Sequence, residues 1–345
     1  MARQTLQSVA SQLGEIRTSA IQRGVSLGFQ CFDNEAYART PTLSIKKGYP
    51  VYVAALPHSG KSEFVFELLI NLSQLHGWRH CIYSGEEGDA AEVYVQIIEK
   101  VVGKQFRNYH AKGMVSAYAM TEAERVSAEL WVNDHFFVID DTTDYTPEAF
   151  CAEVDSWERE LGFQFDTMTF DPFNDFARDL RPYGNRIELW LSDVLKMWRR
   201  ECKAKNRAGF LVNHIASVQL EKDPDTKKRY PPLPAPTEWA MGQEWFRRGF
   251  LMMTLWRPPD FMLDEHGRNY AKNELVIAIQ KAKPKGIATL TRVSLFWDWQ
   301  RKRYQEREGN MYYFAGQLQA ERERNRVNSL NTEQRYYTDN DELDY

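Results

Sequence analysis

Residues 51–62, VYVAALPHSGKS, decide the fold class of this chain. Their first half, 51–56, is a continuous apolar run, which is typical of a strand buried on both faces of a sheet. A turn with Gly60 follows, and residues 61–76 then have the apolar spacing of a helix. Because a turn between a buried strand and a helix gathers backbone N–H groups at one spot, this arrangement predicts a phosphate-binding loop.

The side chains of the same loop fit a nucleotide that is bound together with a metal ion. Lys61 is expected to reach the β- and γ-phosphates of ATP, and the Ser62 hydroxyl is expected to bind Mg²⁺. The common form of the motif begins with glycine, and here another small residue, Ala55, takes that place. The residues predicted to bind the nucleotide are Ala55, Pro57, His58, Ser59, Gly60, Lys61, Ser62 and Glu63.

Strand and helix patterns alternate along the chain, which predicts an α/β fold with a mostly parallel, twisted sheet flanked by helices. Helices are expected at 61–76, 89–102, 147–161 and 186–205. Strands are expected at 51–56, 80–84, 136–140, 165–170 and 209–214, and then near 250–256, 275–280 and 289–297.

Polar residues at the predicted strand ends are candidates for the chemistry, because ligands bind at this edge of a parallel sheet. Asp140 and Asp171 compete for the Mg²⁺ side of the site, and the residues alone favour Asp171 only modestly. Glu86 and Glu87 follow the second strand and are candidates to activate the attacking water. His214 ends the fifth strand, near the expected position of the γ-phosphate.

The composition excludes several classes of protein. The chain has 345 residues, a formal net charge of −4 and 43% hydrophobic residues, which argues against a disordered chain. Its apolar runs are too short to span a bilayer, and its N-terminus lacks a signal-peptide pattern. Four isolated cysteines make neither a disulfide framework nor a metal motif. The sequence therefore predicts a cytoplasmic protein without a membrane partner.

The two ends of the chain differ from residues 23–318, the predicted ATPase domain. Residues 1–22 have apolar residues at helical spacing and are expected to form an amphipathic linker helix, packed on its own subunit or on a neighbour. Residues 319–345 are polar and are expected to form a mobile, acidic tail. Residues 328–345 hold five acids and one base, which is as much net negative charge as the whole chain carries.

The order of the motifs over residues 24–305 resembles the helicase domain of the DnaB/Twinkle-type replicative helicases, which are hexameric motors. GVSLGF (24–29) resembles the family's entry segment, and SGEE (84–87) resembles the strand-end motif with the catalytic glutamate. FDTMTFDP (165–172) resembles the second carboxylate motif. The resemblance implies a RecA-like P-loop NTPase fold.

The resemblance also implies a role for each candidate. It assigns the Mg²⁺ side of the site to Asp171, the activation of water to Glu86 and the sensing of the γ-phosphate to His214. Each of these residues stands at the matching place in the motif order.

A further basic segment, KAKPKG (281–286), matches the place of the family's finger, which reaches the nucleotide bound by the neighbouring subunit. The resemblance implies this catalytic role in trans for Lys281 and Lys283. Lys283 stands where arginine is usual, and lysine lacks the planar fork of arginine, so Arg292 and Arg247 are alternatives.

The family holds single-stranded DNA through loops that face a central channel, and one such loop follows the sensor strand. The matching stretch here is 217–230, in which the candidate DNA-binding residues are Lys222, Lys227, Lys228 and Arg229. An ordinary charged loop is the alternative. The acidic tail is a candidate site for a basic replication partner, such as a polymerase, a primase or a single-strand-binding protein.

Together these features predict an ATP-dependent DNA helicase that works as a hexamer in a bacterial or phage-infected cell, in association with the nucleoid. The alternative function is a RecA-fold DNA-binding ATPase without unwinding activity, which acts as a recombinase, a loader, or a component of a mobile-element or defence system.

Overall fold

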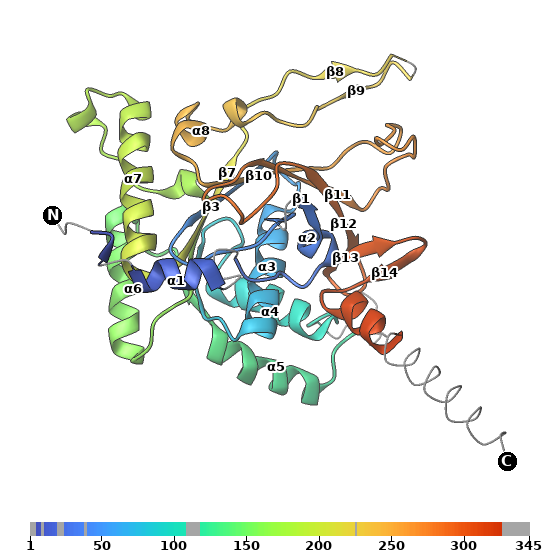
Figure 1. Ribbon diagram of the computed structural model, residues 1–345, viewed down its shortest axis with the longest axis horizontal. Coiled ribbons are helices and arrows are strands. Elements are labelled where there is room, and N and C mark those ends of the chain that lie inside the picture. Colours follow the sequence, from blue (N-terminus) through green and yellow to red (C-terminus); the bar gives the residue numbers. More distant parts are fainter. Residues whose placement is uncertain are drawn as a thin grey trace.

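The apolar run of residues 51–56 forms most of strand β3, Pro50–Ala55, in which every residue is buried. This strand lies inside a ten-stranded sheet with the order β14-β13-β12-β11-β10-β3-β7-β6-β4-β5 (Figure 1). Neighbouring strands are parallel from β10 to β5 and antiparallel from β10 to β14. The computed structural model, which describes residues 5–7, 10–18, 24–37, 40–107, 118–224 and 226–325, therefore confirms a mostly parallel sheet flanked by helices.

The described helices and strands follow one another with short connections. The strands of the large sheet are β3 (Pro50–Ala55), β4 (His80–Ser84), β5 (Phe136–Ile139), β6 (Thr167–Asp171), β7 (Ala208–His214), β10 (Leu251–Trp256), β11 (Glu274–Lys281), β12 (Arg292–Asp298), β13 (Arg303–Glu308) and β14 (Met311–Tyr313). Two small antiparallel pairs stand apart from it, β1 (Glu35–Tyr37) with β2 (Thr40–Pro41), and β8 (Glu221–Lys222) with β9 (Arg229–Tyr230). The α-helices are α1 (Ala10–Thr18), α2 (Gln30–Asp33), α3 (Lys61–His76), α4 (Ala90–Val102), α5 (Glu122–His135), α6 (Pro147–Leu161), α7 (Ile187–Lys205) and α8 (Glu244–Arg248).

The elements expected in the middle of the chain are confirmed, with small shifts at their ends. Helices α3 and α6 have the predicted bounds, and the strand expected at 165–170 begins at Thr167 and includes Asp171. Helix α5 and the hairpin of β13 and β14 are additional to the predicted elements.

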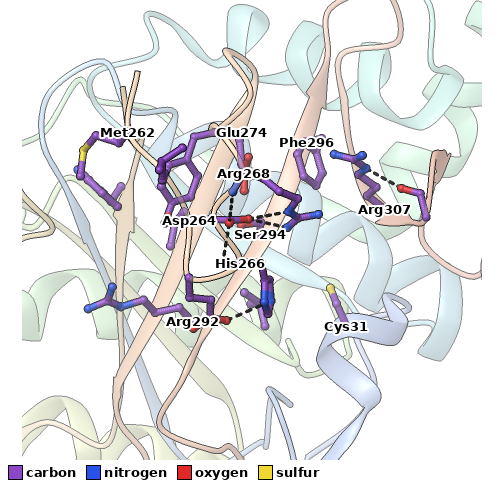
Figure 2. Close-up of a pocket in the computed structure, with 17 residues that line it drawn as sticks. Cys31, Met262, Asp264, His266, Arg268, Glu274, Arg292, Ser294, Phe296 and Arg307 are labelled. Carbon is purple, nitrogen blue, oxygen red and sulfur yellow. Dashed lines mark hydrogen bonds and ion pairs between the residues drawn. The ribbon is translucent and has the colours of Figure 1, made fainter. Parts of the chain in front are cut away.

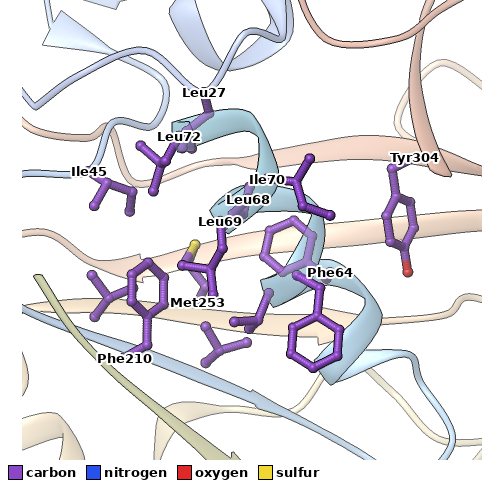
Figure 3. Packing of buried hydrophobic residues seen from close by; sticks show 14 of the residues in the cluster. Leu27, Ile45, Phe64, Leu68, Leu69, Ile70, Leu72, Phe210, Met253 and Tyr304 are labelled. Carbon is purple, nitrogen blue, oxygen red and sulfur yellow. The ribbon is translucent and has the colours of Figure 1, made fainter. Parts of the chain in front are cut away.

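Two hydrophobic layers pack on the two faces of the sheet, and alternate residues of β3 contribute to each of them. Val51, Val53 and Ala55 belong to the layer that contains α3, whereas Tyr52 and Ala54 belong to the layer that contains α6 and α7. Figure 3 shows the first layer, in which apolar side chains of α3 lie over those of the sheet. Because β3 is covered on both faces, the loop at its end is held in a fixed position.

The antiparallel strands are tied to α3 by a buried ion pair. Arg303 of β13 donates from Nε to both carboxylate oxygens of Glu67, at 2.8 Å each, and Glu67 is fully buried. Arg303 also donates to Asn71 Oδ1 at 2.9 Å and to the Lys100 carbonyl at 3.0 Å. A buried charge pair whose other hydrogen bonds are satisfied fixes the relative position of the two elements.

The chain ends are described only in part. The expected linker helix at 1–22 has helix α1 over Ala10–Thr18, with Leu6 and Leu13 exposed by 78% and 44%, and the rest of that segment lies mostly outside the described residues. Residues 317–325 are helical, so the predicted tail begins with helix, and its acidic part lies outside the described residues. Within the described ranges, no helix is long and apolar enough to cross a membrane.

Candidate nucleotide site

The loop between β3 and α3 has the backbone geometry of a phosphate-binding loop. His58 and Gly60 have positive φ angles of 59° and 81°, so the chain turns sharply on both sides of Ser59. A Cβ atom on Gly60 would lie 3.0 Å from the Tyr304 hydroxyl and 3.2 Å from Arg257, so only glycine fits there. Helix α3 begins at Lys61, and the free N–H groups of its first turn form a positive site that suits phosphate.

Asp171 is brought to this loop by the sheet. The Ser62 hydroxyl donates to Asp171 Oδ2 at 2.7 Å, and both residues are buried. Asp140, the other candidate, is exposed and follows β5, which is separated from β3 by β4, β6 and β7. Its Oδ1 atom accepts a hydrogen bond from the backbone of Asp141. The structure therefore places Asp171, and not Asp140, beside the phosphate-binding loop.

The surroundings of Asp171 fit a divalent cation. Burial raises the pKa of its carboxyl to about 7; the Ser62 hydrogen bond and the charge of Lys61 act against the rise, and the nearby charges of Glu87 and Glu86 add to it. Its Oδ1 atom is buried without a hydrogen-bond partner in the described part of the chain. A bound cation would satisfy this oxygen and favour the charged carboxylate.

The protein supplies only part of such a cation site. Among the described residues, no group of three or more His, Cys, Asp or Glu side chains is arranged to hold a metal ion. Mg²⁺ is commonly held by one or two protein oxygens together with phosphate oxygens and water. The Ser62 and Asp171 pair fits that mode of binding.

Glu86 and Glu87 follow β4 and point to different partners. Glu86 Oε1 lies 2.9 Å from His214 Nε2, whereas Glu87 accepts a hydrogen bond from Gln96 at 2.6 Å. The other ring nitrogen of His214, Nδ1, lies 3.3 Å from Lys61 Nζ. The geometry thus distinguishes two adjacent acids that the sequence could not separate, and it places Glu86 at the loop.

Five side chains therefore converge at the carboxyl edge of the parallel strands, and we call this group the strand-edge site: Lys61, Ser62, Glu86, Asp171 and His214. They come from the ends of strands β4, β6 and β7 and from the first turn of α3, which follows β3. The site contains a cation for phosphate, oxygens for a metal, an acid for a water molecule, and a ring that touches both Lys61 and Glu86.

Glu63 and the remaining loop residues have different surroundings. The Glu63 carboxylate pairs with Lys100, whose ammonium group is buried and lies 4.4 Å from the centre of the Trp297 ring. Pro57 and His58 are exposed on the loop, and Ser59 is buried. Glu63 therefore offers the nucleotide its backbone N–H group, while its side chain is occupied.

Lys281 and Lys283 lie away from the strand-edge site in the same chain. Lys281 ends β11 and pairs with Met252 near the start of β10, at the opposite edge of the sheet from the phosphate-binding loop. Its ammonium group donates to the Phe246 carbonyl and lies 4.8 Å from the centre of the Phe246 ring. Burial, with the charge of Lys283, lowers the pKa of Lys281.

The two alternatives for the finger are also remote from the loop. Arg247 pairs with Glu244 on α8 at 3.0 Å, and Arg292 begins β12, where it faces Ala278. The structure thus brings none of the finger candidates to the phosphate-binding loop of its own subunit.

The predicted DNA-binding residues lie on a hairpin that extends beyond the sheet (Figure 1). The Glu221 carboxylate accepts a hydrogen bond from the Tyr230 hydroxyl at 2.9 Å, and Asp223 Oδ1 accepts from Thr226 at the hairpin tip. These acids are engaged within the hairpin, which presents four exposed basic side chains: Lys222, Lys227, Lys228 and Arg229.

Arg257 is a residue of the site that the sequence analysis missed. Its Nε atom donates to the Ser59 carbonyl at 3.1 Å, and its Nη2 atom lies 3.4 Å from the Tyr304 hydroxyl. The signal was available only from the topology, since β10 lies parallel to β3 with Leu255 beside Ala55. The residue after β10 must then lie beside the phosphate-binding loop.

A cavity of about 610 Å³ lies between the β10–β11 loop and strands β11 to β13 (Figure 2). Its wall mixes acids and bases, and Arg268 is already paired with Asp264 at 2.6 Å. No residue of the strand-edge site lines it. The cavity is therefore separate from the predicted nucleotide site, and its lining offers no concentrated positive charge for phosphates.

Comparisons with known proteins agree with this architecture. No family model matches the chain. In sequence the chain is 26% identical over 203 residues to the Twinkle homolog protein, chloroplastic/mitochondrial, of Arabidopsis thaliana. The match covers 59% of this chain and 27% of that protein, so the chain spans only about a quarter of the relative's length.

Two solved structures share the fold. One is the ATPase domain of a DnaB-like replicative helicase, with a TM-score of 0.66, 15% identity, and coverage of 89% of this chain and 100% of that one. The other is a DnaB-like replicative helicase, described with its interactions with primase, with a TM-score of 0.64, 14% identity, and coverage of 88% and 69%. The chain therefore has the RecA-like fold of DnaB-type ATPase domains and resembles the DnaB/Twinkle-type replicative helicases.

Proposed function

We propose that this chain is an ATP-dependent DNA helicase of the replicative hexameric type, which threads single-stranded DNA and couples ATP hydrolysis at subunit interfaces to unwinding. The observation that carries the proposal is the convergence of Lys61, Ser62, Glu86, Asp171 and His214 at one sheet edge. The fold of DnaB-type ATPase domains supports it.

Each residue of the strand-edge site has a distinct task in this reaction. Lys61 and the N–H groups of the loop bind the phosphates, and Ser62 and Asp171 hold Mg²⁺. When bound, Mg²⁺ neutralises charge on the phosphate oxygens. Glu86 accepts a proton from the attacking water.

His214 links the phosphate side of the site to the water side. It lies between Lys61 and Glu86, within 3.3 Å of the first and 2.9 Å of the second. A change in the position of Lys61 on loss of the γ-phosphate therefore changes the contacts of His214. Because His214 ends β7 and the basic hairpin follows β7 along the chain, this sensing role connects nucleotide state to the DNA-binding loop.

The finger is supplied by a second subunit in this proposal. Lys281 and Lys283 lie at the opposite edge of the sheet from their own loop, where a neighbour in a ring can receive them. The exposed Leu6 and Leu13 suit an α1 segment that packs on the neighbouring subunit. Both features support a ring, for which a hexamer is the expected size.

Single-stranded DNA is the proposed substrate of the basic hairpin, which offers exposed charges for phosphates. The acidic tail is proposed to contact a replication partner, and primase is the partner named for the DnaB-like relative. The proposed location is the cytoplasm or nucleoid of the host cell.

The test is unwinding of a forked duplex with either a 5′ or a 3′ single-stranded tail, with Glu86→Gln as the inactive control. ATP-dependent strand separation on one polarity of tail supports the helicase. DNA-stimulated ATP hydrolysis without strand separation on either tail would favour the alternative, a RecA-fold ATPase that binds DNA without unwinding it.

A further inference from the structure

Two consecutive residues at the end of β10 hold two different parts of the molecule. Trp256 donates from its indole N–H to the Pro231 carbonyl at 2.9 Å, and Pro231 follows strand β9 of the basic hairpin. Arg257 donates to the Ser59 carbonyl of the phosphate-binding loop at 3.1 Å. The foot of the hairpin and the phosphate-binding loop are thus bonded to neighbouring residues.

On the side of the nucleotide, Arg257 reads the conformation of the loop backbone. Ser59 lies between two residues with positive φ, His58 and Gly60, so its carbonyl position depends on the sharp turn on both sides. Arg257 also approaches Tyr304, which is fully buried, at 3.4 Å. A rearrangement of the loop on nucleotide binding therefore changes the bond to Arg257.

On the side of the hairpin, the loop that follows Arg257 is a brace. Its Phe261 ring lies 5.2 Å from Lys228 Nζ and 6.1 Å from the Tyr230 ring. The ring of Trp256 packs against Tyr270 from the same loop, with centroids 5.9 Å apart. Figure 1 shows the hairpin and the β10–β11 loop extending beyond the sheet in the same direction.

The strand between these contacts is rigid, because all six residues of β10 are buried and the strand is paired on both sides. A rigid strand end that bonds two loops is able to pass a displacement from one to the other. The bonds at Trp256 and Arg257 make such a connection independently of the chain path through His214.

We propose that Trp256 and Arg257 are positioning residues that couple the state of the phosphate-binding loop to the position of the basic hairpin, so that bound nucleotide sets the affinity for single-stranded DNA. The proposal rests on the proposed DNA-binding function of the hairpin. By linkage, DNA then changes the affinity for nucleotide by the same factor.

The test compares the dissociation constant of a fluorescent oligo-dT with and without a non-hydrolysable ATP analogue. In the wild-type chain the two constants are expected to differ by about 5- to 150-fold, the usual range of such coupling. Trp256→Phe keeps an aromatic ring but loses the N–H donor, and its ratio is expected to fall toward one, while its affinity for a fluorescent ATP analogue stays unchanged without DNA.

A matched control is available at the same hairpin. Gln280 donates to the Pro234 carbonyl at 2.7 Å, and no hydrogen bond among the described residues joins its side chain to the phosphate-binding loop. Gln280→Met removes a bond of the same kind and is expected to keep the wild-type ratio. An unchanged ratio in Trp256→Phe, or an equal loss in Gln280→Met, overturns the coupling role.

Two further readouts keep the outcomes apart. Hydrogen exchange in the wild-type hairpin is expected to change when the ATP analogue binds, and no change overturns the coupling even if Trp256→Phe is too unstable to study. Absence of DNA binding by the wild-type chain in every nucleotide state overturns the proposed function as well. DNA binding with a ratio near one overturns the coupling alone.

Discussion

The two halves of the large sheet carry different parts of the proposed reaction. In the parallel half, the ends of β3, β4, β6 and β7 bring five side chains within hydrogen-bond reach of their neighbours. In the antiparallel half, Lys281 and Lys283 lie at the other edge of the sheet, and no contact in the described residues joins them to the phosphate-binding loop.

This difference follows from strand direction. Parallel strands end at one edge, so polar residues at their ends meet within a single chain. Strand β11 runs in the opposite direction to β10, so a residue at its end is carried to the far edge. Residues that serve the chain's own site and residues that serve a neighbour's site can therefore be separated by topology.

The largest expected effect is in the parallel half, at Glu86. Glu86→Gln keeps the size of the side chain but removes the base, and ATP turnover is expected to fall by roughly 10²- to 10⁴-fold. Binding of a fluorescent ATP analogue is expected to persist, because Glu86 does not hold the phosphates. Glu87→Gln is the matched control and is expected to hydrolyse ATP at nearly the wild-type rate, since Glu87 is bonded to Gln96. Equal losses in both variants would contradict the division of labour between the two acids.

The next effect concerns the junction of the two halves. Arg303→Met leaves the fully buried Glu67 without its ionic partner, and the free energy of unfolding is expected to fall by about 3–5 kcal/mol. Urea unfolding measures the change. The double variant Glu67→Leu with Arg303→Met is expected to recover much of the loss, because apolar residues often replace a buried pair at little cost. A single variant as stable as the wild type would show that the pair does not join the halves.

The smallest expected effect is at the hairpin. Lys222 and Arg229 lie opposite each other in β8 and β9, and replacing both with Gln is expected to weaken binding of single-stranded DNA. The slope of the logarithm of affinity against the logarithm of salt concentration should fall by about 0.7 for each phosphate that the hairpin no longer binds. A salt titration by fluorescence anisotropy gives the slope. Lys203→Gln, on the exposed face of α7, is the control and should leave it unchanged.

Much of the parallel half was predictable because its signals are local. A buried apolar run followed by GKS predicts β3, the loop and α3 together, and the strand-end rule then selects the polar residues that follow other buried strands. The sequence could not choose between Asp140 and Asp171 without the family resemblance, or between Glu86 and Glu87, because each choice depends on strand order and side-chain direction.

The antiparallel half was less predictable because its strands contain buried charges. In β13, Arg303 and Glu306 are buried, where Arg303 bonds Glu67 and Glu306 accepts backbone N–H groups of α2, so the strand has no apolar pattern. Helix α5 was missed although Thr121 and Glu124 form a capping box at its start. Arg257 was missed because its role depends on which strand lies beside β3.

The central claim is that the two halves meet across a subunit boundary, where one chain supplies the strand-edge site and its neighbour supplies Lys283. Lys283→Ala and Glu86→Gln are each expected to be nearly inactive when assembled alone. A trace of Lys283→Ala added to an excess of Glu86→Gln gives interfaces with an intact Glu86 on one side and an intact Lys283 on the other. ATP hydrolysis per added Lys283→Ala chain is expected to approach the wild-type rate. A mixture that stays as inactive as its two components, while mass measurement shows mixed assemblies, would contradict the account.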